Sequence, residues 1–272
     1  MRLFVLSSAC MARITRLSAF MLAGCFVQAC SVAPQTDRRV PGPVARRIVA
    51  QRASAVVVTD RDDLSRWMDR RLVASRTARD ADGGSATPIS PDGYFLTANH
   101  VLERMAGRNV FVIYRAGARL VPIQARVVWR SAGADLALLH IPVKTPYYYR
   151  WTPARRWLPE GSRVIHGGIA TGFKSSGGKL TTTLAPESPF TGNRKFKIDI
   201  PLQPGDSGGP VVDADGALVG INSAVEFLVP METAFFIDSE ANRPNTRMIE
   251  SLLRIDRARN SRGNPTVEQP HG

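Results

Sequence analysis

The fold of this chain is restricted most by a succession of short apolar runs, each ended by glycine, proline or a polar turn. The runs are rich in β-branched, leucine and aromatic residues, which favour extended backbone on a half-buried pleated surface. They predict strands at Ala53–Thr59, Tyr94–Thr97, Val110–Tyr114, Leu120–Trp129, Leu136–Ile141, Arg163–Gly167, Leu180–Leu184, Phe196–Ile200, Pro210–Asp213, Ala217–Asn222 and Ala234–Ile237. Short strands at this spacing are typical of a closed or sandwiched all-β structure.

Helical periodicity is confined to two segments. Asn245–Arg257 places its apolar residues on one stripe, which predicts a terminal amphipathic helix. Asp62–Arg76 has apolar residues at helical spacing and predicts a helical insertion. The passage 142–159 is rich in proline and aromatic residues, has little periodicity and predicts a connector, while the polar residues 258–272 predict a flexible tail.

The N-terminus has the composition of a secretory signal. Arg13 and Arg16 precede a short apolar run and then small residues, which predicts a signal peptide over residues 1–24. The run is shorter than the ~20 apolar residues that a helix needs to span a bilayer. The ending Leu22-Ala23-Gly24-Cys25 resembles a bacterial lipobox, and this resemblance implies cleavage before Cys25 and attachment of lipid to its thiol.

Residues 25–49 then form a polar, Pro-rich tether between the lipidated Cys25 and the folded domain. Phe26 follows the cysteine where an aspartate would favour the inner membrane, so the outer membrane is expected. The alternative is ordinary signal cleavage after Ala29 or Ala33, which gives a soluble periplasmic protein. All three cysteines lie in this N-terminal part, so no internal disulfide is expected in the folded part.

The chain is strongly basic, with a formal net charge of +13. Its arginines are scattered and no nucleic-acid-reading motif accompanies them, so nucleic acid is not the expected partner. The charge suits either an anionic membrane surface or a plain arginine-rich surface. No group of histidines, cysteines and carboxylates has the spacing of a metal site, and neither a metal nor another cofactor is expected.

The motif that carries chemistry is Gly205-Asp206-Ser207-Gly208-Gly209-Pro210. A serine hydroxyl attacks well only when a base removes its proton, and the glycines around Ser207 allow a tight bend with unobstructed amides. The amides of Gly205 and Ser207 are therefore predicted to form an oxyanion hole, in which one donor is typically worth ~3 kcal/mol of transition-state stabilisation. The alternative is a plain glycine-rich turn between two strands.

A base for Ser207 must come from one of four histidines. His271 lies in the tail, and His140 and His166 lie within strand-like runs, where a histidine is more often structural than catalytic. His100 follows a strand that runs into a turn, which places a side chain at the rim of a sheet. Asp135 stands before another apolar strand and is the carboxylate predicted to accept the Nδ1 proton of His100.

These residues resemble the chymotrypsin-like serine peptidases, and most closely the bacterial HtrA/Deg-type branch, over about residues 53–257. The resemblance is carried by Ser90–Val101 (SPDGYFLTANHV), Asp135–Leu139 (DLALL), Gly205–Pro210 (GDSGGP), Gly216–Ala224 (GALVGINSA) and Ala234–Ile237 (AFFI). The chain order of His100, Asp135 and Ser207 matches the family as well.

The resemblance implies a chymotrypsin-like double six-stranded β-barrel with a C-terminal helix. The peptidase domain is then expected at 50–257, with barrels at about 50–142 and 158–240 and the helix at about 245–257. Residues Ser223, Ala224 and Val225 are expected to pair with the substrate backbone. The implied activity is that of a serine endopeptidase acting through a Ser-His-Asp triad and an acyl-enzyme intermediate on exported or envelope polypeptides.

Some positions depart from the HtrA/Deg pattern. HtrA-type proteins usually carry a peptide-binding PDZ module after the peptidase, whereas a short tail follows residue 257 in this sequence, and Asp206 stands where such enzymes commonly have asparagine. Arg46-Arg47-Ile48-Val49 resembles a trypsin-like activation site, from which a freed N-terminus would pair with Asp206; a basic linker that meets a strand is the simpler interpretation. The segment Pro201–Pro204 has no acidic residue to attract Lys or Arg, and Asn222 and Ala224 offer no cation to hold an acidic side chain, which weakly favours cleavage after small or medium apolar residues.

Two other functions are consistent with the same motifs. A catalytically silent or latent peptidase-fold protein would bind partners in the envelope, although such proteins usually lose a triad residue and none is lost here. An esterase would also use Ser207. An α/β-hydrolase, however, places its histidine after the serine, and only His271 follows Ser207.

Overall fold

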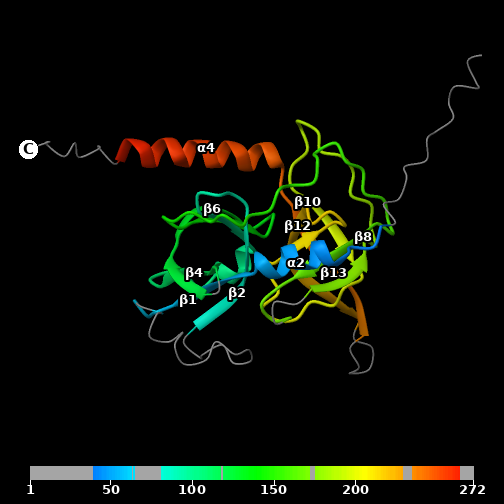
Figure 1. The fold of residues 1–272 in the computed structure, drawn as a ribbon, viewed down its shortest axis with the longest axis horizontal. Coiled ribbons are helices and arrows are strands. Elements are labelled where there is room, and N and C mark those ends of the chain that lie inside the picture. Colours follow the sequence, from blue (N-terminus) through cyan, green and yellow to red (C-terminus); the bar gives the residue numbers. More distant parts are fainter. Residues whose placement is uncertain are drawn as a thin grey trace, which may run out of the picture. The chain divides into compact units, whose positions relative to one another are not determined.

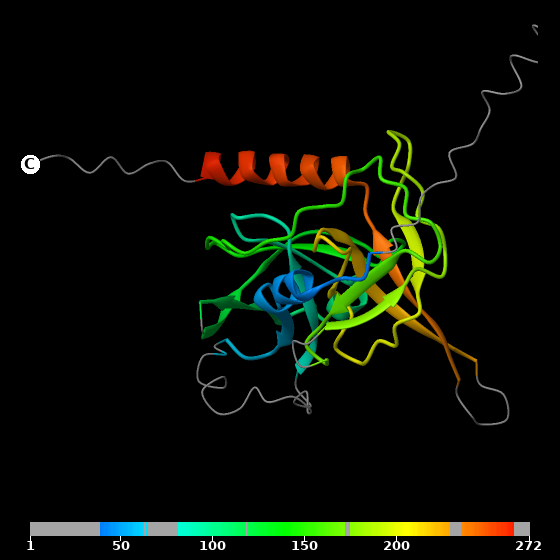
Figure 2. The ribbon, with the colours of Figure 1, turned by 45° about the vertical axis from the view of Figure 1, so that its right-hand side comes forward.

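Two curled antiparallel sheets form the framework of the part of the chain that the computed structural model describes (Figures 1 and 2). The described residues are 39–62, 64, 81–117, 119–171, 175–228 and 235–263, and they belong to one compact unit, Thr36–Gly272. The predicted signal peptide, Cys25 and nearly all of the predicted helical insertion at 62–76 lie outside them. None of the described helices is long and apolar enough to cross a membrane.

The first sheet has seven strands in the order β5-β4-β1-β2-β3-β7-β6, and every neighbouring pair is antiparallel. Its strands are β1 (Ser54–Thr59), β2 (Ala81–Pro88), β3 (Tyr94–Thr97), β4 (Asn109–Ala116), β5 (Arg119–Gln124), β6 (Arg126–Ser131) and β7 (Leu136–His140). A single turn of 3-10 helix, η1 (Asn99–Leu102), follows β3 directly.

The second sheet has six strands in the order β10-β13-β12-β11-β8-β9. They are β8 (Arg163–Gly167), β9 (Ser175–Lys179), β10 (Arg194–Ile198), β11 (Pro210–Val212), β12 (Leu218–Leu228) and β13 (Phe235–Arg243). This pair of curled sheets, followed by a C-terminal helix, confirms the predicted all-β, chymotrypsin-like double-barrel class.

Two strand predictions were wrong in detail. The run Leu120–Trp129 is divided between β5, which pairs with β4, and β6, which pairs with β7. Ala125 lies between them, and its amide donates to the carbonyl oxygen of Val110 at 2.8 Å. Leu180–Leu184 makes only isolated bridges, whereas the glycine-rich residues before it form β9. Periodicity missed β9 because its glycines have no side chains: a Cβ on Gly178 would lie 2.3 Å from Asp199 Oδ1.

Helix α2 (Pro43–Gln51) corrects the predicted domain boundary. Residues 43–49 were assigned to the tether, but they form a helix with Pro43 in its first turn and with Ala45 and Val49 buried. These two side chains are four residues apart and therefore share one helix face. The folded domain consequently begins before residue 50, and α2 is part of its core.

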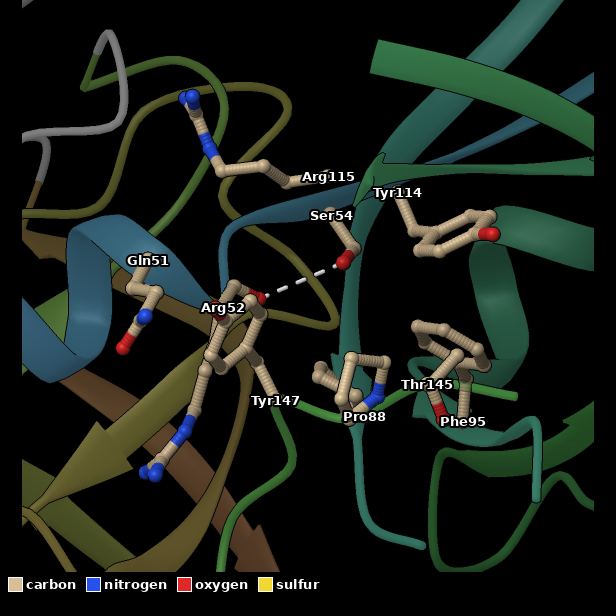
Figure 3. Close-up of a pocket in the computed structure, with 10 residues that line it drawn as sticks. Gln51, Arg52, Ser54, Pro88, Phe95, Tyr114, Arg115, Thr145 and Tyr147 are labelled. Carbon is tan, nitrogen blue, oxygen red and sulfur yellow. Dashed lines mark hydrogen bonds between the residues drawn. The ribbon is translucent and has the colours of Figure 1, made fainter. Parts of the chain in front are cut away.

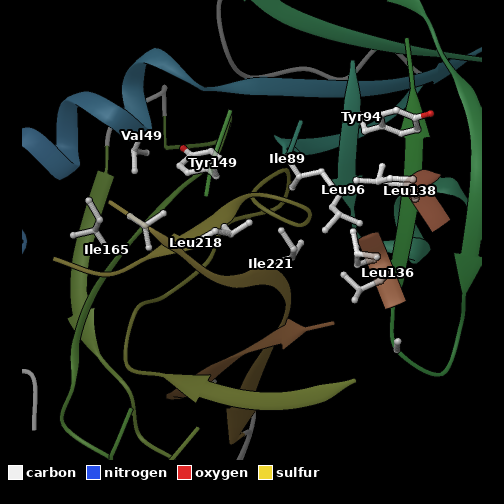
Figure 4. Packing of buried hydrophobic residues seen from close by; sticks show 14 of the residues in the cluster. Val49, Ile89, Tyr94, Leu96, Leu136, Leu138, Tyr149, Ile165, Leu218 and Ile221 are labelled. Carbon is white, nitrogen blue, oxygen red and sulfur yellow. The ribbon is translucent and has the colours of Figure 1, made fainter. Parts of the chain in front are cut away.

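The core that includes α2 is continuous from one sheet to the other. Figure 4 shows Val49 beside Ile165 and Leu218 of the second sheet at one end of this cluster. Leu96 and Leu138 of the first sheet lie at the other end of the cluster. Each of these side chains is at most 2% exposed. Burying a side chain of this size contributes about 1.5–3 kcal/mol, so this shared cluster holds the two sheets together.

Helix α4 (Thr246–Gly263) extends the predicted terminal helix and attaches the end of the chain to the first sheet (Figure 1). Its Asp256 carboxylate is nearly buried and accepts hydrogen bonds from Arg126 Nη1 and Nη2 at 2.9 and 2.6 Å and from the Tyr94 hydroxyl at 2.9 Å. Arg257 forms a second, bidentate pair with Asp92 at 2.6 and 2.8 Å. Because α4 follows β13 of the second sheet, these contacts join both sheets.

Candidate active site

His100 is placed at the rim of the first sheet by the buried strand before it. All four residues of β3 are buried, and in η1 the neighbours Asn99, Val101 and Leu102 are buried as well. The chain therefore turns sharply at a fixed point, and the His100 side chain remains 42% exposed. Asn99 contributes to this anchoring because its Oδ1 accepts a hydrogen bond from Arg130 Nε at 2.8 Å.

Asp135 meets His100 from the turn that precedes β7. Its Oδ2 lies 2.9 Å from His100 Nδ1, and its Oδ1 accepts the His100 backbone amide at 2.9 Å. Asp135 has a φ of +45°, the one positive value among the described non-glycine residues. Non-glycine residues rarely adopt this conformation, and when the surrounding structure imposes it the residue is often at a functional site.

Ser223 supplies a third hydrogen bond to Asp135, since its hydroxyl donates to Asp135 Oδ2. From the sequence, Ser223 was predicted to pair with the substrate backbone, and its contact with the Asp135 carboxylate was not predicted. The local sequence does not predict this contact, because Asp135 precedes a strand of the first sheet, Ser223 lies in a strand of the second, and the two residues are 88 positions apart. The sequence signal is limited to a polar side chain within a strand.

These contacts shift the ionisation of both partners. The hydrogen bond that His100 makes to the Asp135 carboxylate raises the pKa of the His100 imidazole above its ordinary value, and this effect outweighs the opposing effect of burial. Burial by itself raises the pKa of the Asp135 carboxyl, but the hydrogen bonds from His100 and Ser223 together hold that pKa below its usual range. Asp135 is thus kept ionised beside a histidine that is easily protonated.

Ser207 lies in the tight loop that leads into β11. Gly205 and Gly208, on either side of it, have φ values of +105° and +89°, which L side chains rarely adopt. The Ser207 hydroxyl donates to the carbonyl oxygen of Ser223 at 3.1 Å rather than to His100. Ser223 therefore touches both Asp135 and Ser207, and hydrogen bonds among catalytic groups often tighten only when substrate is bound.

The backbone around Ser207 provides unengaged donors. Within the described part of the chain, the amides of Gly205 and Ser207 donate to no protein acceptor, whereas those of Asp206, Gly208 and Gly209 are all bonded. Two amides that are free on one short loop can both donate hydrogen bonds to an anionic oxygen.

Asp206 is fully buried behind this loop and is held by its own neighbourhood. Its carboxylate accepts the Gln203 amide at 3.0 Å and the Thr171 amide at 3.3 Å. The resembling activation sequence lies within α2, where Ile48 packs against Gly216. The carboxylate is therefore satisfied without a freed N-terminus.

Strand β12 presents a free edge beside Ser207. β11 pairs with β12 only over residues 218–221, while β13 pairs with it from 221 to 228. Beyond the Asn222 amide, which bonds to the Gly209 carbonyl oxygen at 2.8 Å, the predicted substrate segment 223–225 keeps its other edge unpaired by any described strand. An exposed edge of this kind can accept an extended peptide as an added strand.

The other two histidines that the structure describes, His140 and His166, have partners of their own. His140 lies against the Tyr94 ring with centroids 4.5 Å apart, and burial lowers its pKa. His166 is fully buried with Nδ1 3.3 Å from Asn222 Nδ2, and burial lowers its pKa as well. His271 lies outside the described residues. No group of three or more potential metal-ligating side chains occurs among the described residues.

A pocket elsewhere on the domain differs from this site. It opens to solvent and is lined by Gln51, Arg52, Ser54, Pro88, Phe95, Tyr114, Arg115, Thr145, Pro146 and Tyr147 (Figure 3). None of the predicted catalytic residues lines it. The side chains of Arg52 and Arg115 diverge there, with their guanidinium groups at the lower left and upper left of Figure 3, so they do not bind one anion together.

Comparison with known proteins agrees with this geometry. The family described as "Trypsin-like peptidase domain" matches residues 84–221, about half of the chain, including His100, Asp135 and Ser207. A solved structure titled as a variant of the HtrA-type protease AlgW with tripeptide superposes with a TM-score of 0.54 and 25% identity, covering 78% of this chain and 62% of that one.

Curated relatives point the same way. A "Probable periplasmic serine endoprotease DegP-like" from Rhizobium meliloti is 29% identical over 172 residues, which is 61% of this chain and 32% of the relative. A protein of the same description from Bartonella henselae is 30% identical over 162 residues, covering 58% of this chain and 31% of the relative. The chain thus matches about a third of the length of these relatives. It belongs to the trypsin-like peptidase domain family and carries a chymotrypsin-like domain of the HtrA/Deg type.

Proposed function

We propose that this protein is a serine endopeptidase in which Ser207 is the nucleophile, His100 the general base and Asp135 the carboxylate that orients and stabilises the histidine. The observation that carries the proposal is the 2.9 Å contact between His100 Nδ1 and Asp135 Oδ2, with Ser223 bonded to both Asp135 and Ser207. The similarity to DegP-like endoproteases supports the same activity.

The reaction follows from these positions. The Ser207 hydroxyl turns from the Ser223 carbonyl oxygen toward His100 Nε2, transfers its proton there and attacks the scissile carbonyl carbon. The resulting imidazolium is stabilised by the ionised Asp135, and the oxyanion accepts the free amides of Gly205 and Ser207. The imidazolium then protonates the leaving amine, which leaves an acyl ester on Ser207.

Water completes the turnover. His100 removes a proton from a water molecule as that water attacks the acyl ester, and the imidazolium returns this proton to Ser207 when the ester bond breaks. His100, Ser207 and water carry out this step by themselves. His100 passes the first proton to the leaving amine and the second to Ser207, so the enzyme is regenerated.

The substrate is proposed to be an extended polypeptide. The free edge of β12 over residues 223–225 would pair with the substrate backbone, which requires an unfolded or loosely held segment. The periplasmic DegP-like relatives support exported or envelope proteins as the substrates. Lipid on Cys25 would hold the domain at the membrane, most simply at the periplasmic face of the outer membrane.

The test compares a chain that begins at residue 25 and carries Cys25→Ser with the same chain that also carries Ser207→Ala. Each is incubated with a fluorophosphonate probe and with casein. We expect the parent to be labelled and to degrade casein, and the Ser207→Ala chain to do neither. A matched Ser261→Ala chain, changed at an exposed serine of α4, should behave as the parent.

Either of two results would refute the assignment. If a folded parent fails to react with the probe, Ser207 is not an activated nucleophile. If Ser207→Ala still degrades casein at the parental rate, another residue carries the activity.

A further inference from the structure

Ser85 connects the two sheets at the loop that bears Ser207. It lies in β2 of the first sheet, is 1% exposed and was given no functional role from the sequence. Its hydroxyl donates to the carbonyl oxygen of Gly205 at 2.7 Å and accepts the amide of Ile169 at 2.9 Å. Its backbone amide donates to the carbonyl oxygen of Ser207 at 2.8 Å.

The contact is close along the whole loop. A Cβ on Gly84 would lie 2.8 Å from the Ser207 carbonyl oxygen, and one on Gly208 would lie 2.1 Å from the Ser85 carbonyl oxygen. The Thr87 hydroxyl donates to the carbonyl oxygen of Gly208 at 2.9 Å. Three carbonyl groups of the loop are therefore turned into the first sheet and held there by β2.

Holding these carbonyls fixes the peptide planes on both sides of the Ser207 amide. Peptide groups are planar, so the Gly205 carbonyl and the Asp206 amide move as one unit, as do the Ser207 carbonyl and the Gly208 amide. The Ser207 amide lies between these two units. The Gly205 amide is separated from the first unit only by the two torsions of a glycine, the residue with the least conformational restriction.

We propose that the Ser85 hydroxyl is a positioning residue for the oxyanion hole: it holds Gly205 at its positive φ, so that the amides of Gly205 and Ser207 converge on the substrate oxyanion. Ser85 itself touches no substrate and acts through Gly205. This inference rests on the proposed peptidase function. It assigns to the first sheet a share in organising the oxyanion hole, whose amides all come from the second.

The test is a set of steady-state measurements on a peptide substrate with Ser85→Ala, Ser85→Thr and Ser54→Ala. Ser54 is a matched control, because it is 5% exposed, lies on the neighbouring strand β1, and its hydroxyl bonds to the carbonyl oxygen of Arg52 and not to the Ser207 loop. A single oxyanion-hole donor is worth about 100- to 1000-fold in kcat. Loss of its positioning in Ser85→Ala should lower kcat by roughly 10- to 100-fold, with KM changed by less than about threefold.

A second readout separates positioning from a general loss of structure. A peptide boronate forms a tetrahedral adduct with Ser207 that places an oxygen in the oxyanion hole, whereas the product peptide that carries the new amino terminus has no carboxylate to place there. Ser85→Ala should weaken boronate inhibition in proportion to kcat and leave product inhibition nearly unchanged. Ser85→Thr, which keeps the hydroxyl, should restore most of kcat, and Ser54→Ala should match the parent in both readouts.

The outcomes are distinct. If the parent itself neither hydrolyses peptide nor reacts with a fluorophosphonate, the proposed function fails and this inference fails with it. If the parent is active but Ser85→Ala retains its kcat and boronate affinity, or if Ser54→Ala is equally impaired, the inference alone is overturned. Should Ser85→Ala not fold, Ser85→Cys replaces it, since it fills the site with a poor hydrogen-bond donor, and the same loss of kcat is expected.

Discussion

Helix α2 offers a direct measurement of where the folded domain begins, because it carries two valines in opposite environments. Val49 is 2% exposed and contacts Gly167, whereas Val44 is 68% exposed. Replacing either by alanine removes the same two methyl groups from the same helix. The gain in helix propensity is similar at both positions, so the difference between the two variants isolates the burial of Val49.

The magnitude follows from this burial. Two buried methyl groups are worth about 1.6 kcal/mol at roughly 0.8 kcal/mol per group. The cavity left between α2 and β8 adds to this loss, since a packed core collapses only partly. Val49→Ala should therefore lower the free energy of unfolding by about 2–3 kcal/mol, while Val44→Ala should stay within about 0.5 kcal/mol of the parent.

The assay is guanidinium unfolding, followed by circular dichroism and by tryptophan fluorescence. The parent begins at residue 25 and carries Cys25→Ser and Ser207→Ala, so that self-cleavage does not interfere. Unfolding midpoints for Val49→Ala and Val44→Ala that agree within about 0.5 kcal/mol, after multiplication by the common m-value, would refute the docking of α2. The tether would then extend to residue 49, as the sequence suggested.

The remaining predictions concern ionisation and anchoring. In a Ser207→Ala background, the His100 ring should titrate above its ordinary pKa of ~6.5, and Asp135→Asn should lower that pKa because it removes the charged acceptor. Since the pKa of His100 is raised in the folded protein, the His100–Asp135 pair stabilises the fold fully below the unfolded pKa and loses this contribution as pH rises through the folded pKa. Peptidase activity needs the neutral imidazole and should therefore rise over that same pH interval. A His100 pKa at or below the ordinary value would contradict the assignment. For the full-length chain expressed in bacteria, replacing Cys25 by alanine should abolish incorporation of labelled palmitate, and unchanged labelling would exclude the lipid anchor.

Local sequence determined the strand-rich class because alternating and β-branched runs have few other stable conformations. The buried β3 and β8 were predicted with the same bounds that the structure shows, Tyr94–Thr97 and Arg163–Gly167. The terminal helix was predicted from its apolar stripe, although it continues to Gly263. Periodicity failed for β9, because its glycines carry no side chains to form a pattern, and at Gly178 the neighbouring residues leave no room for one.

The candidate catalytic residues were found from sequence because their chemistry restricts the residue types around them. A nucleophile needs glycines for its tight loop, which marks Ser207, and a base at the end of an apolar strand marks His100. Asp135 was weaker as a signal, since an aspartate before a strand is usually a turn residue. The structure adds the contact between His100 and Asp135, which no local pattern specifies.

Only the tertiary structure decided which distant residues support this site. Ser223 bonds to Asp135 across 88 positions, and Ser85 bonds to Gly205 across 120. Val49 was assigned to a tether because the short helix α2, with two buried side chains, resembles a linker in composition. The physical reason is common to all three: burial and hydrogen-bond partners at these positions come from the packing of one sheet against the other, and a chain segment carries no record of what will be packed against it.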